Sequence, residues 1–472
     1  MHSRLRTLAL ALASTLALTS CSTATQADLP REDQVGVQLF MWNWDSIAQE
    51  CEFLSDQGVS WVLTSPPQEH IVGQEWWTIY QPVSYQLESR FGSRDQFKAM
   101  VESCASHGVD IVVDAVINHM ANQSGVGFAG TQFSKYEYPG LYEPEDFNNC
   151  QLTDNGQINN YSDRAEVQTC ELLGLPDLNQ TKPNVQSTIL SYLNDLLSLG
   201  VAGFRIDAAK HMAATDLAAI ISQLPEGTRI IHEVIRGGNE PITPEEYLDS
   251  GDVWEFTYAK SLKGYFGIER ISPEGPEVRF LAHAPSENTV AFVSNHDTER
   301  NGDTLNYQNI IDFELATAFM LAEDYGQPML YSSYAFDFSD FGPEQTSEGV
   351  LDAKCSPEAS GYVKPKPSYQ ANEWICQHRF ESTAKMIQFR KAVSGTKVQD
   401  IFQDGSLYGF ARGDKGYFLI NASSSEERSL ELDVTIPNGS YTNLLTGETV
   451  TIEAGKLVVE LSPKSAIALV RN

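Results

Sequence analysis

The sequence predicts an α/β fold: a (β/α)8 TIM barrel with a small domain inserted after the third strand and a C-terminal all-β sandwich domain. Two patterns carry this prediction. From Val35 onward, about eight short apolar runs alternate with amphipathic stretches that usually end at Gly, as in such a barrel. After about Gly395 the pattern changes to short strands divided by turn dipeptides such as Asp404-Gly405 and Asn438-Gly439. A chain of 472 residues can hold one large barrel with an appendage.

The expected barrel elements follow one another along the chain. Strands are expected at residues 35–41, 60–64, 110–117, 202–207, 229–234, 253–257, 290–294 and 328–332. Helices are expected at residues 45–57, 94–107, 185–199, 217–224, 313–322 and 382–393. Ser93 is a residue type that favours a helix N-cap, and Gly58, Gly108 and Gly200 stand where helices end.

The barrel is expected to consist of residues 35–118 and 180–394. The intervening residues 119–179 are rich in Asn, Gly, Tyr and Asp and are too long for an ordinary strand-to-helix loop. We therefore expect an inserted domain there and a separate β domain at residues 395–472.

The first residues have the pattern of an export signal. Two arginines precede an apolar stretch that is too short to span a bilayer as a mature helix, so residues 1–20 are expected to be a signal peptide. The segment Leu18-Thr19-Ser20-Cys21 resembles the lipobox of bacterial lipoproteins, which predicts a possible lipid anchor through Cys21 and a tether over residues 22–34. The alternative is ordinary cleavage near Ala27. Either way the mature chain is exported, where disulfides are permitted.

Charge and cysteine content narrow the function classes. The chain has 32 Lys+Arg against 63 Asp+Glu, a net charge of −31, which argues against nucleic acid and against anionic lipid as partners. Such a surface is typical of a solvated secreted protein or of adaptation to salty surroundings. Without Cys21, six of the seven cysteines remain, and their connectivity is open among fifteen pairings.

Polar residues gather where four of the expected strands end. The segments are Asp114–His119, Gly203–His211, His232–Val234 and Ser294–Asp297. The loops at these ends form the mouth of a barrel, where function concentrates. One charged residue on an apolar strand is often a structural ion pair, but four converging strand ends with Asp, Glu, Arg and His are hard to explain as packing.

Three of these acids, Asp207, Glu233 and Asp297, suffice for glycoside hydrolysis as nucleophile, acid/base and stabiliser of a cationic transition state. A retaining enzyme needs its two working carboxyls about 5–5.5 Å apart, and neighbouring strands about 4.8 Å apart can supply that spacing. Arg205 is two residues before Asp207, on the same side of the strand, and can keep that carboxylate ionised. Glu233 must hold a proton near neutral pH.

These four segments resemble the conserved regions of the α-amylase family of glycoside hydrolases. The segment Leu175-Pro-Asp177-Leu178 matches a further family motif. Within the family, the chain is most similar to animal-like α-amylases and their bacterial relatives. That similarity is carried by Ser65-Pro66-Pro67, Trp76-Trp77, Tyr80–Tyr85 and Val116–Met120. The resemblance runs from about Val35 to the C-terminal domain.

The resemblance implies roles for individual residues. Asp207 is similar to the family nucleophile, Glu233 to the acid/base and Asp297 to the transition-state stabiliser. Residues similar to sugar-hydroxyl ligands are His119, His211 and His296, and residues similar to further subsite contacts are Gln81, Tyr161, Arg205, Lys210 and Ile235. Trp76, Trp77 and Tyr80 resemble an aromatic platform, which suits the apolar faces of glucose rings; the alternative is that the two Trp are core residues.

The resemblance also implies a structural Ca2+ between the inserted domain and the barrel. Its ligands would be Asn118, Asp177 and the backbone carbonyls of Gln168 and His211, an oxygen-only set that suits Ca2+ and is poor for zinc. Family likeness further pairs Cys51 with Cys104 and Cys150 with Cys170, which leaves Cys355 with Cys376.

Two departures from the animal-like pattern concern chloride and a loop. By resemblance, Arg205 and Asn295 are at two positions of the activating chloride site, but the third falls on Met329, which cannot attract an anion, so we expect activity without a chloride cofactor. The loop after Asp297 reads Thr298-Glu299-Arg300-Asn301 and lacks the Gly-rich run of animal enzymes.

The sequence therefore predicts a secreted, monomeric α-amylase that cleaves α-1,4-glucans such as starch, glycogen and maltooligosaccharides internally, with retention of configuration. The alternatives are a related glucanotransferase, an α-glucosidase, or a surface lipoprotein that binds glucan without cleaving it. The last is disfavoured because all three acids are present.

Overall fold

A computed structural model of the chain describes residues 29–269, 283–355 and 361–472. The expected signal peptide, Cys21 and most of the expected tether lie outside these residues. Residues 29–34 pack against the base of the barrel, where Arg31 forms an ion pair with Asp252 at 2.5 Å. Across the described part of the chain, no helix is long and apolar enough to cross a membrane.

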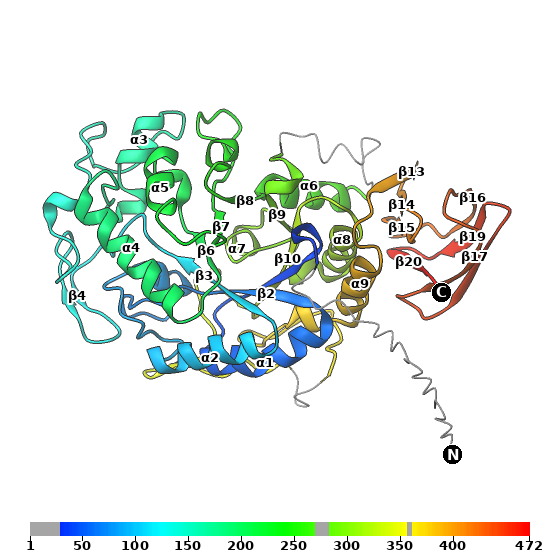
Figure 1. Ribbon diagram of the computed structural model, residues 1–472, viewed down its shortest axis with the longest axis horizontal. Helices are drawn as coiled ribbons and strands as arrows, with labels where there is room; N and C mark the ends of the chain where they lie inside the picture. The colour runs from blue at the N-terminus through cyan, green and yellow to red at the C-terminus, as the bar shows by residue number, and fades with distance from the viewer. Residues whose placement is uncertain (1–28, 270–282, 356–360) are drawn as a thin grey trace, which may run out of the picture.

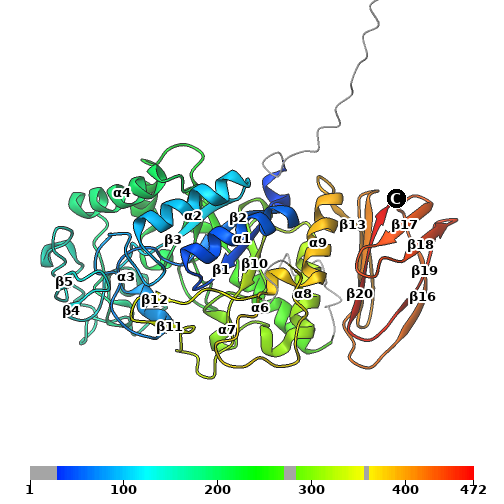
Figure 2. The same ribbon diagram turned by 90° about the horizontal axis from the view of Figure 1, so that it is seen from below.

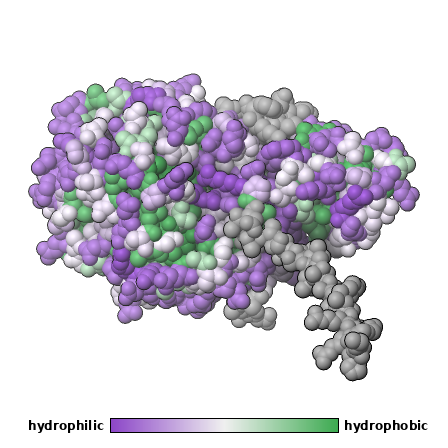
Figure 3. All heavy atoms as spheres, viewed as in Figure 1, coloured by the Kyte–Doolittle hydropathy of each residue, from purple (hydrophilic) through white to green (hydrophobic). Residues whose placement is uncertain are grey.

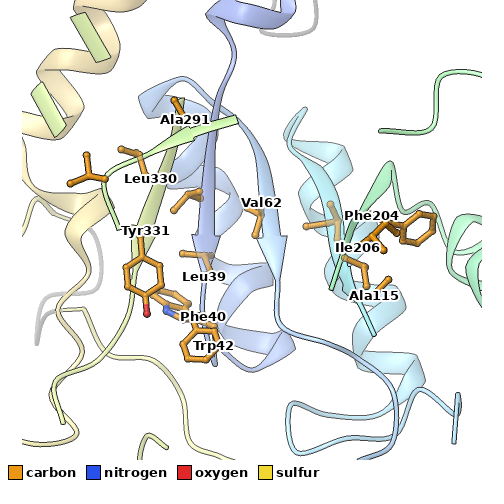
Figure 4. Close-up of a cluster of buried hydrophobic side chains, with 14 of the residues drawn as sticks. Leu39, Phe40, Trp42, Val62, Ala115, Phe204, Ile206, Ala291, Leu330 and Tyr331 are labelled. Atoms are coloured by element: carbon orange, nitrogen blue, oxygen red, sulfur yellow. The ribbon is translucent and has the colours of Figure 1, made fainter. Parts of the chain in front are cut away.

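Eight parallel strands close into a barrel, in the order β1-β10-β9-β8-β7-β6-β3-β2. The strands are β1 (Val35–Leu39), β2 (Val59–Thr64), β3 (Asp110–Ala115), β6 (Gly203–Ile206), β7 (Arg229–His232), β8 (Asp252–Trp254), β9 (Thr289–Phe292) and β10 (Gln327–Ser332). The predicted barrel is confirmed. Figure 4 shows apolar side chains such as Leu39, Val62 and Leu330 packed between neighbouring strands and the surrounding layer, all of them buried.

Helices surround the barrel (Figure 1). They are α1 (Trp44–Gln57), α2 (Arg94–Ser106), α4 (Pro183–Ser198), α5 (Ala214–Ile221), α6 (Phe256–Gly267), α7 (Thr298–Asn301), α8 (Ile310–Ala322) and α9 (Glu381–Ala392). Ser93 caps α2 in a reciprocal capping box with Gln96, and Gly58 ends α1 with φ 97°.

The sixth strand is shorter than predicted. The apolar run 253–257 reads as one strand, but β8 stops at Trp254 and Thr257 belongs to α6. The Glu255 side chain accepts a hydrogen bond from the Thr257 backbone N–H at 2.9 Å and so begins the helix. Local capping has therefore replaced the strand that the apolar pattern indicated.

The segment after the third strand carries small elements of its own. They are β4 (Gly125–Val126), β5 (Gln132–Phe133) and α3 (Arg164–Thr169). Three disulfides, Cys51–Cys104, Cys150–Cys170 and Cys355–Cys376, confirm the pairing that the family resemblance implied. A second small hairpin, β11 (Gln345–Thr346) and β12 (Gly349–Val350), follows the last barrel strand.

The C-terminal part is an antiparallel β domain, as predicted, but its eight strands form one continuous sheet. The strands are β13 (Val398–Asp404), β14 (Leu407–Arg412), β15 (Gly416–Asn421), β16 (Arg428–Asp433), β17 (Gly439–Asn443), β18 (Thr449–Glu453), β19 (Lys456–Leu461) and β20 (Ser465–Arg471). The β17–β18 hairpin pairs with β20 on one side and β19 on the other, which joins what would otherwise be two sheets.

The C-terminal domain and the inserted segment lie at opposite ends of the long axis (Figure 1, Figure 2). Arg412, at the end of β14, joins the C-terminal domain to the barrel: it donates to the carbonyl of Glu323, just after α8, at 3.1 Å, and Arg390 of α9 donates to the same carbonyl at 2.7 Å. Figure 3 shows hydrophilic side chains over much of the viewed face, in keeping with a net charge of −31.

Candidate active site

A cavity of about 260 Å³ opens where the barrel strands end. Its lining residues are Trp76, Trp77, Tyr80, Gln81, His119, Asn122, Leu172, Leu173, Leu175, Asp207, Ala208, Glu233, His296 and Asp297. Nine of the site residues expected from the sequence are in this set. The cavity therefore lies at the carboxyl ends of the strands, where barrel loops converge.

Arg205 lies under the cavity and binds three carboxylates. Its Nη1 contacts Asp114 Oδ1 at 2.6 Å and Asp207 Oδ1 at 2.9 Å, while its Nη2 contacts Glu233 Oε1 at 2.8 Å. Asp114 and Arg205 face each other on β3 and β6. Because one guanidinium contacts both Asp207 and Glu233, these carboxylates lie side by side. The backbone N–H of Ala208 holds the other oxygen of Glu233 at 2.7 Å.

The acids of this cluster differ in how strongly the site opposes their ionisation. Burial raises the pKa of Asp207 well above its usual value, although the charge of Arg205 opposes the shift. Burial and then the charge of Glu233 raise the pKa of Asp297 to about 7. Burial also raises the pKa of Asp114 against Arg205. Four carboxyls around one arginine favour retention of a proton within the cluster near neutral pH.

His296 is held in one orientation by a stack of rings. Its ring lies between Tyr80, at 5.2 Å and 3° between planes, and Phe40, at 4.8 Å and 19°. Gln38 Nε2 donates to His296 Nδ1 at 3.0 Å, so the ring proton is on Nε2, which lies 2.8 Å from the Tyr80 hydroxyl and 3.5 Å from Asp297. Burial keeps the pKa of His296 well below its usual value, so the ring is neutral.

The two tryptophans line the cavity and are not core residues. Trp77 is 37% exposed, and Trp76 packs edge to face against Tyr80 with ring centroids 5.9 Å apart. Gln81 and His119 complete this wall, and His119 Nε2 contacts the Tyr80 carbonyl at 3.0 Å. Burial lowers the pKa of His119 to about 4, which keeps its ring neutral.

A second group of expected residues lies beside the cavity. Lys210 donates to the carbonyl of Ile235 at 2.7 Å, and its Nζ is 5.5 Å from the centre of the Tyr161 ring. Lys210 also forms an ion pair with Glu240. His211 packs edge to face on Tyr161, with ring centroids 6.1 Å apart. Tyr161, Lys210, His211 and Ile235 are absent from the cavity lining. Lys210 and His211 follow β6, Ile235 follows β7, and Tyr161 comes from the inserted segment.

Sequence reasoning missed several residues of the site. Gln38 and Phe40 lie in and after the apolar run of β1, where they read as core. Leu172 and Leu173 line the cavity from the inserted segment, and Leu173 is 79% exposed with φ 54°. An exposed apolar residue in the left-handed backbone region is uncommon, but neither property is visible in the sequence.

The oxygen atoms expected to bind Ca2+ have the properties such a site needs. Asn118 Oδ1 is buried and has no hydrogen-bond partner among the described residues. Asp177 is also buried, and burial raises its pKa well above the usual value, so a bound cation would stabilise its carboxylate. The backbone joins the two: Leu178 N–H donates to the Asn118 carbonyl at 2.9 Å. His211 Nδ1 contacts the Val167 carbonyl, next to Gln168, at 3.1 Å.

Met329 is 1% exposed and belongs to an apolar cluster that includes Trp254 and Phe292. The neighbouring guanidinium of Arg205 lies 5.0 Å from the centre of the Trp254 ring. An apolar thioether in this position supplies no charge to an anion.

Comparisons with known proteins agree with this arrangement. Residues 43–241 match the family model "Alpha amylase, catalytic domain", and residues 423–464 match "Bacterial Alpha amylase C-terminal domain". An alpha-amylase of Streptomyces violaceus is 42% identical over 466 residues, which cover 98% of this chain and 78% of that protein. An alpha-amylase-related protein of Drosophila kikkawai is 37% identical, with 92% and 91% covered.

Solved structures give the same result. Alpha-amylase I of Eisenia fetida has a TM-score of 0.85 and 31% identity, and the match covers 94% of this chain and 98% of that one. A mutant of that enzyme in complex with maltohexaose has a TM-score of 0.80. The chain therefore belongs to the α-amylase family of glycoside hydrolases, closest to the animal-type enzymes and their bacterial relatives, and is an α-amylase that hydrolyses starch-type glucans with retention of configuration.

Proposed function

We propose that Asp207 is the nucleophile and Glu233 the general acid/base of this hydrolysis, with Asp297 as stabiliser of the cationic transition state. The observation that carries the assignment is the contact of one guanidinium, Arg205, with both Asp207 and Glu233, at 2.9 and 2.8 Å. It holds the two carboxyls side by side in the cavity. Retaining glycosidases need their working carboxyls close together, about 5–5.5 Å apart.

In the first step, Asp207 attacks the anomeric carbon and Glu233 gives its proton to the glycosidic oxygen. Arg205 holds Oδ1 of Asp207, and we assign the attack to Oδ2. The bond to the leaving chain breaks, that chain departs with the proton, and a glycosyl ester on Asp207 remains. Asp297 offers negative charge to the sugar while its ring is cationic.

In the second step, Glu233 takes a proton from water and the water oxygen attacks the anomeric carbon. The ester bond to Asp207 breaks, so the carboxylate is regenerated and the configuration is retained after two inversions. Ala208 N–H and Arg205 keep the Glu233 carboxyl in place during both proton transfers, through contacts of 2.7 and 2.8 Å.

The neutral rings and the aromatic wall are proposed to bind the glucan. His119, His211 and His296 would contact sugar hydroxyls, and Trp76, Trp77 and Tyr80 would stack on sugar faces. Gln81, Tyr161, Lys210 and Ile235 are proposed as further contacts. Internal cleavage is supported by the exposure of Trp77 and Leu173, 37% and 79%, since a long chain can continue past both sides of the cavity.

The assignment is tested with Asp207→Asn and Glu233→Gln on soluble starch, with the surface variant Asp195→Asn as control. Each site variant is expected to lose activity by at least about a thousandfold while still binding starch. Asp195 forms an ion pair with Arg94, with 2.6 Å between the two charged groups, and neither residue lines the cavity, so its variant is expected to stay active. Full activity in either site variant would contradict the role assigned, and sizing the products distinguishes internal cleavage from transfer or terminal release.

Members of this family typically bind calcium. We propose that Asn118, Asp177 and the carbonyls of Gln168 and His211 hold the ion in this chain. The orphaned Asn118 Oδ1 and the buried Asp177 support that proposal. A bound Ca2+ would supply the positive charge that these oxygens lack and would join the inserted segment to the barrel.

The three disulfides indicate an oxidising, extracellular-type compartment. We further propose that export proceeds through residues 1–20 and that Cys21 carries a lipid anchor. Mass spectrometry of the mature N-terminus tests this: a lipidated Cys21 is expected, and an unmodified terminus near Ala27 would contradict it.

A further inference from the structure

Two exposed phenylalanines lie on the loop that follows β10. Phe338 is 66% exposed and Phe341 is 53% exposed, and their rings meet edge to face with centroids 5.2 Å apart. Single exposed apolar residues are ordinary in proteins, but a paired, contiguous apolar surface is typical of a contact site.

The loop is bound to the segment that carries the aromatic wall of the cavity. Trp76 donates its backbone N–H to the carbonyl of Asp340 at 3.0 Å and its ring N–H to the carbonyl of Ser339 at 2.8 Å. Gly342 donates to the Gln74 carbonyl at 3.2 Å. A Cβ at Gly342 would lie 2.5 Å from that oxygen, so this close approach requires glycine.

The loop that carries the two phenylalanines is therefore hydrogen-bonded to both the backbone and the ring of Trp76. Trp76 and Trp77 both line the cavity, and Trp77 is 37% exposed at its rim. A glucan chain that leaves the cavity past Trp76 would reach this loop. Because the backbone of the loop is already held before binding, less conformational entropy is lost when a ligand stacks on the rings.

We propose that Phe338 and Phe341 form an outer binding site for the neutral α-glucan chain, beyond the cavity on the side of Trp76 and Trp77. The proposal rests on the function proposed above. Aromatic faces fit the apolar faces of glucose rings. The site would favour long substrates over short ones, since a short oligosaccharide bound at the catalytic acids does not extend to the loop.

Charge around the pair favours a neutral, hydroxyl-rich occupant over a second copy of this chain. Asp337 and Asp340 flank the rings and are exposed. Their carboxylates can accept hydrogen bonds from sugar hydroxyls. Two copies meeting on this surface would instead bring these acids together, on chains that each carry a net charge of −31.

The test compares kcat/KM for amylose with kcat/KM for maltotriose in Phe338→Ser/Phe341→Ser. The ratio of the two values is expected to fall about 5- to 50-fold, as the loss of two aromatic contacts implies. Tyr362→Ser is the matched control: Tyr362 is 48% exposed but contacts Phe53 and Gln57 of α1, so its ratio stays that of the wild type. A wild-type ratio in the double variant would overturn the proposal.

Binding without turnover separates this site from the proposed function. In a Glu233→Gln background, the two serine substitutions are expected to raise the Kd for amylose by a similar factor. An unchanged amylose Kd would refute the outer site even if the catalytic roles stand. A wild-type protein that cleaves neither substrate would refute the proposed function, and the binding measurement would still test the loop. Sedimentation that shows wild-type dimers and monomeric double variant would assign the pair to a protein interface instead.

Discussion

Arg300 is a buried cation surrounded by aromatic rings. Its replacement is expected to lower the free energy of unfolding by more than the loss of its own contacts. Its side chain is 4% exposed, and the rings of Phe40, Trp76, Tyr334 and Phe336 surround its guanidinium, with centroids 4.6–5.3 Å away. Its Nη1 donates to the His296 carbonyl at 2.9 Å. Arg300 thus supports both His296 and Trp76 from behind the cavity.

The size of this loss of stability depends on Glu299, the buried carboxylate that lies 3.3 Å from the Arg300 guanidinium. Removing one partner of a buried ion pair costs about 3–5 kcal/mol, because the other charge remains buried and uncompensated. Tyr331 and Ser333 still donate to Glu299, at 2.8 and 2.9 Å, so we expect Arg300→Met to cost about 3 kcal/mol, the lower end of that range. Glu299→Gln/Arg300→Met is expected to cost at least about 1.5 kcal/mol less than the single variant.

The loss of folding stability in Arg300→Met should also depend on pH. Burial already raises the pKa of Glu299 to about 6 even with Arg300 present, and without Arg300 the folded-state pKa rises further above the unfolded value. The folded protein then binds that proton more tightly than the unfolded chain, so the free energy of unfolding falls as pH rises from the unfolded value of 4.5 through about 6 and above.

Urea denaturation of the wild type, both variants and Glu299→Gln at pH 5 and pH 8 measures the free energy of unfolding. Relative to the wild type, we expect Arg300→Met to lose more unfolding free energy at pH 8 than at pH 5. The loss in Glu299→Gln/Arg300→Met should depend little on pH. Equal losses in the single and double variants at both pH values would refute the argument that an uncompensated Glu299 charge sets the cost.

Three further predictions concern ions and protonation. Because the family resemblance puts Met329 at the third chloride position, starch hydrolysis in halide-free buffer is expected to change less than about twofold on adding chloride; a large, saturable activation would be inconsistent with this. Chelation with EDTA should lower the Tm of the wild type, and in Asn118→Ala that shift should shrink; an equal shift in both proteins would place the metal elsewhere. Asp297→Asn should raise the Tm at pH 8 but not at pH 4, because a pKa of about 7 in the folded state makes the ionised acid destabilising only as pH rises from its unfolded value near 4 through 7; circular dichroism melts that show no pH difference would count against it.

The barrel was predictable because its signals are local. Ser93 with Gln96 three residues later specifies the start of α2, and the structure has the full capping box there. The strand at 253–257 was overextended because Glu255 is an unusual N-cap, and its apolar neighbours hide the start of α6.

The candidate site was predictable to the level of strand ends but not of contacts. Polar residues on apolar strands identified Asp207, Glu233 and Asp297. The threefold pairing of Arg205 depends on the register between β3 and β6, which places Asp114 opposite Arg205. The rings around Arg300 come from the residue after β1, the Trp76 segment and the loop after β10, and no local pattern in the sequence links them.

The roles of Asp207 and Glu233 are tested most directly by trapping the glycosyl ester. Glu233→Gln is incubated with α-maltotriosyl fluoride, whose fluoride leaves without help from an acid, while the missing base slows attack by water. Peptide mass spectrometry is expected to find one maltotriosyl group, on Asp207, and Asp207→Asn/Glu233→Gln should carry none. A sugar on Asp114 or Asp297, or fluoride release with no adduct and unchanged turnover, would contradict the account.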